Sequence, residues 1–94
     1  MRKETVSEKV EGGKLVRIEI DFNHKINSVR ITGDFFLHPE ESINEIEDAL
    51  KGLDINESEK NIKKILENII QKENIELVGI NAEVIARLVK GTVK

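Results

Sequence analysis

The sequence predicts a single small α+β domain, in which a small antiparallel β-sheet carries about three helices on one face. Between residues 15 and 32 apolar side chains recur at every second position, as in strands that bury one face. From residue 42 onward they recur at every third or fourth position, as in amphipathic helices. The chain has 94 residues, of which 38% are hydrophobic and 35% charged, and this is the length and composition of one globular domain.

The composition argues against several classes of function. The net charge is −3, so neither nucleic acid nor an anionic membrane is expected as a partner. The absence of cysteine excludes disulfides, thiolate nucleophiles and cysteine-bound metal centres. No apolar run approaches the roughly 18–20 residues of a membrane span, and the first residues lack the apolar core of a secretory signal. A cytoplasmic location is therefore expected, and the abundance of Lys, Glu and Ile is typical of thermophile proteins.

The N-terminal third predicts an arm followed by a hairpin. Residues 1–11 are polar and charged, and the Gly12-Gly13 pair interrupts regular structure. We therefore expect a flexible N-terminal arm over residues 1–11 and a single domain over residues 12–94. Two strands, 15–22 and 26–32, are joined by a short turn at Asn23-His24-Lys25. The residues expected on the inner face are Val16, Ile18, Ile20 and Phe22 of the first strand, with Val29 and Ile31 of the second.

Three helices are expected after the hairpin. The first begins at Pro39 or, alternatively, at Ser42 with Glu45 completing a capping box, and it ends near Gly52. The second is capped by Asn56, and its apolar stripe gives the clearest helical signal in the chain. That stripe consists of Ile62, Ile65, Leu66, Ile69 and Ile70. After an extended run at 75–78, a third helix is capped by Asn81 and ends at Gly91.

A corner between the hairpin and the first helix is the most informative part of the sequence. Gly33-Asp34 ends or bulges the second strand, and Phe35-Phe36-Leu37 is expected to form a short third extended piece. Adjacent residues in an extended segment point to opposite faces. One Phe can therefore enter the core, while the other faces solvent or a partner. The alternative is that a twist at Gly33 buries both.

The other candidate residues carry weaker chemical signals. His38 lies near Asp34 in the sequence, which could orient a base, but no nucleophile is clearly placed beside the pair; alternatively, His38 packs at the helix start. Gly12-Gly13-Lys14 lacks the glycine spacing of a P-loop and its Ser or Thr. Lys14 could still contact an anion held mainly by another protein, or it could be a solvated strand entry. No spacing of His and carboxylates suggests a metal site.

Four motifs in this order resemble the accessory C-terminal domain of lipoate–protein ligases, and in particular the stand-alone small subunit of archaeal two-subunit enzymes. The resemblance spans residues 12 to about 89, and it implies a fold similar to that of iron–sulfur scaffold proteins. The motifs are Gly12-Gly13-Lys14-Leu15, Ile31-Thr32-Gly33-Asp34-Phe35-Phe36, His38-Pro39-Glu40-Glu41 and Glu76-Leu77-Val78-Gly79.

The resemblance implies an accessory role rather than catalysis by this chain. Such ligases use ATP with Mg²⁺ to convert lipoate to lipoyl-AMP, and then transfer the lipoyl group to a lysine of an acceptor protein. By resemblance, this chain forms a heterodimer with the catalytic subunit, enables adenylation, and on its own is inactive and binds no cofactor. Gly13 and Lys14 would close the substrate and nucleotide site. The partner interface would consist of Gly33, Asp34, Phe35, Phe36, His38 and Pro39.

Two other functions remain open at this stage. The chain could be a binding module that docks the lipoyl-acceptor protein without a role in adenylation. It could also be an independent small enzyme that uses Asp34 and His38. Adenylation without this chain would favour the former, and turnover by the chain alone would favour the latter.

Overall fold

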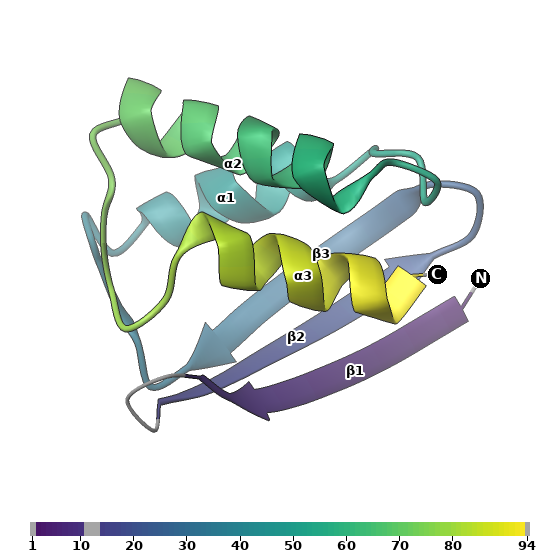
Figure 1. Ribbon diagram of the computed structural model, residues 1–94, viewed down its shortest axis with the longest axis horizontal. Coiled ribbons are helices and arrows are strands. Elements are labelled where there is room, and N and C mark those ends of the chain that lie inside the picture. Colours follow the sequence, from purple (N-terminus) through teal and green to yellow (C-terminus); the bar gives the residue numbers. More distant parts are fainter. Residues whose placement is uncertain (1, 11–13, 94) are drawn as a thin grey trace.

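The computed structural model describes residues 2–10 and 14–93 and shows an antiparallel sheet covered on one face by helices (Figure 1). The three-stranded sheet has the order β1-β2-β3, and a separate two-stranded ribbon pairs β4 with β5. The α+β class and the expected number of helices are confirmed. The elements are β1 (Arg2–Lys9), β2 (Leu15–Phe22), β3 (Ile26–Gly33), β4 (Phe36–His38), α1 (Ser42–Leu50), α2 (Glu59–Lys72), β5 (Glu76–Val78) and α3 (Ala82–Val93).

The β2–β3 hairpin forms as predicted, and its alternating side chains face the helices. Ile18 lies opposite Ile31 and Ile20 opposite Val29, so the apolar faces of the two strands coincide. A register irregularity at Asp21/Phe22 then allows Phe22 to pair with Ile26. The four inward residues predicted for β2 are all buried, namely Val16, Ile18, Ile20 and Phe22.

The N-terminal prediction requires a correction. Residues 2–9 do not form an arm but the strand β1, which pairs with β2 over its whole length, from Arg2 opposite Phe22 to Lys9 opposite Leu15. The sequence of β1 is mostly polar because this strand lies at the edge of the sheet. Only Val6 supplies an apolar inward side chain, and its neighbours on that face are the half-buried Glu4 and Glu8.

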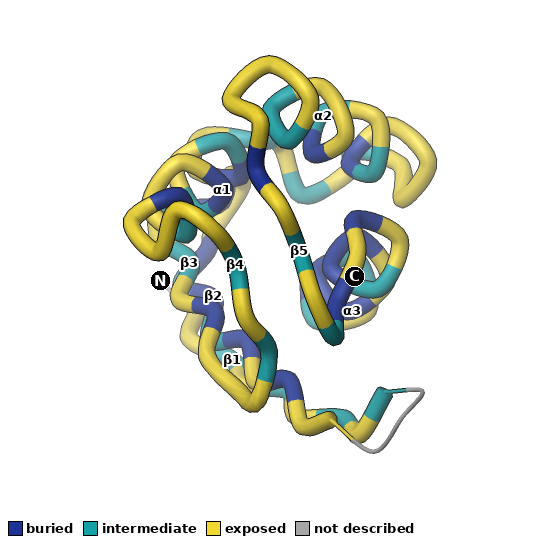
Figure 2. Tube along the Cα trace, turned by 90° about the vertical axis from the view of Figure 1, so that its left-hand side faces the viewer, coloured by how far each residue is buried: buried dark blue, intermediate teal, exposed yellow. Residues whose placement is uncertain are grey.

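The predicted third strand also needs correction, because the Phe35-Phe36-Leu37 segment does not join the sheet. Residues 36–38 form β4, which pairs antiparallel with β5 and brings Phe36 opposite Val78 and His38 opposite Glu76. In Figure 2 the two strands run side by side between α1 and α3. The backbone edge of β3 is instead covered by α1, where Glu47 Oε2 accepts a 2.8 Å hydrogen bond from the Ile31 N–H.

Helix boundaries differ from the predictions by a few residues. α1 begins at Ser42, but Ser42 is buried inside the first turn and makes no side-chain cap, so the predicted capping box does not form. A turn over Pro39–Glu41 precedes it. α2 is capped by Ser58 rather than Asn56, and Ser58 Oγ accepts a 3.1 Å hydrogen bond from the Asn61 N–H.

The last helix begins where expected and continues further. Asn81 Oδ1 accepts a 2.9 Å hydrogen bond from the Val84 N–H, which is the predicted N-cap. The predicted end at Gly91 is wrong, because α3 continues to Val93. Val93 is buried in the core, so continuing the helix past Gly91 removes an apolar side chain from water.

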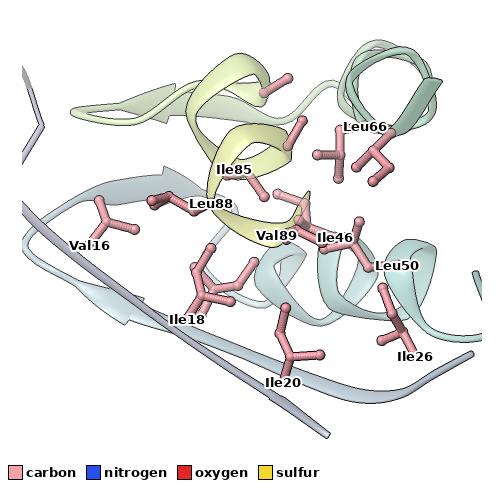
Figure 3. Packing of buried hydrophobic residues seen from close by; sticks show 14 of the residues in the cluster. Val16, Ile18, Ile20, Ile26, Ile46, Leu50, Leu66, Ile85, Leu88 and Val89 are labelled. Atoms are coloured by element: carbon pink, nitrogen blue, oxygen red, sulfur yellow. The ribbon is translucent and has the colours of Figure 1, made fainter. Parts of the chain in front are cut away.

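The core lies between the sheet and the helices (Figure 3). α1 packs on β3 and α3 packs on β1 and β2, while α2 rests mainly on the other two helices. Ile62 and Leu66 of α2 are buried, and Ile69 and Ile70 are partly buried against the same cluster. Within the described residues, no helix combines the length and apolar composition needed to cross a membrane.

Gly33 occupies a position at the end of β3 that admits only glycine. Its φ is +148°, and a Cβ there would lie 2.1 Å from the Leu15 carbonyl oxygen and 3.0 Å from Val16 Cα. Both contacts involve backbone, so a side chain could be accommodated only by moving the strand. The same carbonyl accepts a 2.8 Å hydrogen bond from the Asp34 N–H, which fixes the chain as it leaves the sheet.

We expect Gly33→Ala to lower the free energy of unfolding by about 2–3 kcal/mol, since β2 and β3 must separate locally to admit the methyl group. Urea denaturation measures this change. Gly91→Ala is the matched control: a Cβ there meets nothing within 4 Å, and Gly91 lies in a helix, so this variant should gain up to about 1 kcal/mol. Equal stability of the Gly33→Ala variant and the parent would contradict the close approach.

An ion pair joins the edge strand to the last helix. The Arg87 guanidinium donates to both Glu8 carboxylate oxygens, at 2.9 Å from Nη1 and 2.5 Å from Nη2. This hydrogen bonding lowers the pKa of Glu8 and raises that of Arg87. Because Glu8 is easier to ionise in the folded state, its contribution to stability is present above its unfolded-state pKa and is lost as the pH falls through the lowered value.

We therefore expect Glu8→Gln to lower the melting temperature at pH 7, and we expect the difference from the parent to disappear in acid below the lowered pKa of Glu8. Thermal unfolding followed by circular dichroism across this pH range checks the result. Glu4→Gln is the control, because the Glu4 partner Arg2 lies on the same strand at 3.2 Å and joins no second element. A pH-independent effect of Glu8→Gln would argue against the ion pair as its cause.

Candidate partner-docking site

Three segments that are distant in the sequence meet at one end of the molecule. The Leu15 carbonyl, at the start of β2, accepts a hydrogen bond from the Asp34 N–H, and the chain continues from Asp34 into β4. β5 then pairs with β4 and leads into Gly79. A Cβ on Gly79 would lie 3.5 Å from both Lys14 Cγ and Phe35 Cβ, so these two residues lie close together. The structure thus brings Lys14 to the predicted Gly33–Pro39 corner.

Phe35 and Phe36 face opposite directions, as the extended-chain argument predicts. Phe35 is partly buried and packs against the core, and so is Leu37. Phe36 lies between them in sequence and keeps 70% of its surface exposed. The alternative in which both Phe residues are buried is therefore wrong. The role of Phe36 in binding a partner stays a prediction.

Phe36 has an apolar neighbour that the sequence argument missed. Val78, directly opposite it in the ribbon, is 53% exposed. Leu15 is 39% exposed, and these three are the large hydrophobic residues that the described part of the chain leaves exposed. All three belong to the same corner. The signal for Val78 in the sequence was the alternation Glu76-Leu77-Val78, but its pairing with β4 could not be read from that run.

The remaining predicted residues line the exposed side of the corner. His38 lies in β4 opposite Glu76, and Asp34, His38 and Pro39 are all exposed. In the part of the chain that the structure describes, no hydrogen bond joins Asp34 to His38. The geometry therefore gives no support to an acid–base pair. Gly13, which was predicted to act with Lys14, lies outside the described residues.

The hollow beside the corner contains few groups that could take part in a reaction. It has a volume of about 320 Å³ and is lined by Val10, Gly79, Ile80, Asn81 and Val84. The Asn81 side chain already caps α3, and no lining residue titrates. Among residues 2–10 and 14–93, no group of three or more His, Asp or Glu is arranged to hold a metal ion. The distinctive property of the site is its exposed apolar surface, which fits association with another protein.

Known proteins match this chain in sequence and in fold. The pattern that defines the family described as "Bacterial lipoate protein ligase C-terminus" matches residues 4–89, so it includes most of β1. A "Lipoate-protein ligase A subunit 2" of Thermoplasma acidophilum is 45% identical over 42 residues. That match spans 44% of this chain and 45% of the relative, which is less than half of each.

A solved structure resembles the whole domain. It is described as an archaeal lipoylation system with a bi-partite lipoate protein ligase and its E2 lipoyl domain, also from Thermoplasma acidophilum. One of its chains superimposes with a TM-score of 0.72 at 27% identity, and the match covers 94% of this chain and 97% of that one. The resemblance expected from the sequence is thereby confirmed. The chain belongs to the family of lipoate–protein ligase C-terminal domains.

Proposed function

We propose that this chain is the accessory subunit of a two-part lipoate–protein ligase. It binds the catalytic subunit and enables the ATP-dependent conversion of lipoate to lipoyl-AMP, before the lipoyl group passes to an acceptor lysine. Family membership supports this proposal, as do a relative named subunit 2 and a similar chain in a bi-partite ligase structure. The observation that carries it is the exposed Phe36–Val78 pair, because a small domain gains nothing from exposing these side chains to water.

The site supports a contribution through binding and closure rather than proton transfer. The residues that the structure describes at the corner include neither an activated nucleophile nor a hydrogen-bonded pair of acid and base. Adenylation requires phosphate groups to be held in an ordered pocket from which water is excluded. A small domain placed over such a pocket orders the loops around it and keeps water out. In this proposal the complex, and not this chain alone, holds lipoate, ATP and Mg²⁺.

The residues of the corner would divide this work between docking and closure. Phe36 and Val78 supply apolar contact, while Gly33, Phe35 and Leu37 hold the ribbon in place from behind. Lys14 is exposed and lies at the Gly79 end of the ribbon, so docking would carry its ammonium group toward the partner. An ammonium group in that position can stabilise the negative charge of a nucleotide phosphate or a carboxylate.

We expect Phe36→Ala to raise the dissociation constant of the complex with the catalytic subunit about thirtyfold, which corresponds to about 2 kcal/mol for a central apolar anchor. Isothermal titration calorimetry measures the change. Since Phe36 is mostly exposed, the melting temperature of the free chain should stay the same. Val78→Ala should weaken binding by a smaller factor, because valine has less surface to bury.

The control for this experiment is Lys60→Ala, on the exposed side of α2 and away from the ribbon. It should bind as the parent does. Unchanged affinity in both Phe36→Ala and Val78→Ala would remove the ribbon as the docking site. If the catalytic subunit formed lipoyl-AMP at full rate without this chain but transferred the lipoyl group poorly, the chain would instead be a module that docks the acceptor.

We expect Lys14→Ala to lower the rate of lipoyl-AMP formation by the complex about tenfold, through loss of a positive charge near the reacting phosphates. Pyrophosphate release from ATP and lipoate measures this rate. Lys14→Arg keeps the charge and should retain most of the activity. Equal rates for Lys14→Ala and the parent at saturating subunit concentrations would show that Lys14 has no part in closing the site.

A further inference from the structure

Negative charge is concentrated in the two stretches of chain that form and flank the β4–β5 ribbon. Residues 31–50 and 73–86 contain no lysine or arginine, although the chain has 15 of these residues. The same stretches contain half of its 18 acidic residues, six in the first and three in the second. These nine are Asp34, Glu40, Glu41, Glu45, Glu47, Asp48, Glu73, Glu76 and Glu83.

The fold places several of these carboxylates beside the apolar pair. Asp34 lies two residues before the start of β4, and Glu40 and Glu41 follow the strand in the turn that leads to α1. Glu76 lies in β5 two residues from Val78, so both side chains emerge on the same face of the ribbon. Eight of the nine acidic residues are exposed. The ninth, Glu47, is half-buried and accepts a hydrogen bond from the backbone edge of β3.

Carboxylates at the α1 side of this region are close enough to affect one another. Loss of solvent around the Glu45 carboxyl raises its pKa, and the nearby negative charges of Glu73 and Asp48 raise it further. Glu45 lies in the first turn of α1, and Glu73 is the residue that ends α2. The start of α1 and the end of α2 thus bring acidic side chains to the same side of the molecule, and the basic residues Lys51 and Lys72 lie just outside the two stretches.

From this distribution we infer that the surface docking on Phe36 and Val78 is an apolar pocket rimmed by lysine and arginine side chains. The inference rests on the proposed function, in which the occupant is the catalytic subunit. Phe36 and Val78 would enter the pocket, and the basic rim would face Asp34, Glu40, Glu41 and Glu76. Opposite charge around an apolar contact speeds encounter and rejects wrong partners more than it adds affinity.

A second copy of the chain is a poor occupant of this face. Pairing two ribbons through Phe36 would bring two acidic rims against each other, and like charges brought together in an interface oppose association. The same rim therefore keeps the free chain from self-associating through an exposed aromatic side chain. A surface of opposite charge satisfies both the apolar pair and the carboxylates around it, and Lys14 is a basic residue at the Gly79 end of the ribbon.

The test is the association rate of this chain with the ligase catalytic subunit of the same source, measured by biolayer interferometry between about 50 mM and about 1 M NaCl, where the screening length falls to about 3 Å. We expect the association rate constant to fall at least about tenfold over this range. At low salt the double variant Glu40→Gln/Glu76→Gln should associate at least about threefold more slowly than the parent, with nearly the same dissociation rate. At high salt the association rate constants of the double variant and the parent should be equal.

The matched control is Glu59→Gln/Glu67→Gln, which removes the same charge from exposed positions of α2. It should behave as the parent. Binding that is insensitive to salt and to the Glu40/Glu76 change overturns the inference but leaves the proposed function intact. Failure to form a complex at any salt concentration overturns both. A homodimer detected by light scattering, and dissolved by Phe36→Ala, would assign this face to a second copy and also overturn the inference.

Discussion

The structure depends on the burial of one face of β2. This strand lies between β1 and β3, and its residues Val16, Ile18 and Ile20 have no exposed surface. Both neighbouring strands take their register from it, and α3 packs across it. Because a slip of one residue would turn every one of these side chains toward water, the alternation in β2 fixes the register of the whole sheet. The Leu15 carbonyl, at the start of this strand, also fixes the direction of the chain after Gly33.

The elements with strong periodicity could be predicted from sequence, and those that depend on long-range pairing could not. The β2–β3 hairpin and the apolar stripe of α2 carry their own signals. β1 carries almost none, because an edge strand with polar side chains reads like a solvated arm. The pairing of β4 with β5 was equally hidden, since neither three-residue run has a local preference for the other. The cap of α2 is Ser58 and not the predicted Asn56, because both residue types suit an N-cap and the local sequence does not distinguish between them.

The residues of the candidate site also separate into those that could be predicted from the sequence and those that could not. That one of the two adjacent Phe residues must leave the core follows from strand geometry, and the structure identifies Phe36 as the exposed one. Val78 and the surrounding carboxylates could be assigned to the corner only once the ribbon was known. Lys14 was singled out by its charge beside a Gly-Gly pair and by the family resemblance, and its nearness to Phe35 and Gly79 is a result of the fold. The role that each of these residues would have in the proposed complex also depends on contacts with a second protein, and those contacts cannot be predicted from local sequence patterns.

The ribbon is assembled from two parts of the chain with α1 and α2 between them. Phe36 and Val78 are therefore neighbours only when the chain between them is folded so that β4 and β5 pair. A chain whose synthesis has not yet reached β5, or in which the two strands do not pair, cannot display the two side chains together. Any protein that recognises this pair would consequently distinguish mature molecules from unfinished ones, so recognition at the ribbon would also act as quality control on folding.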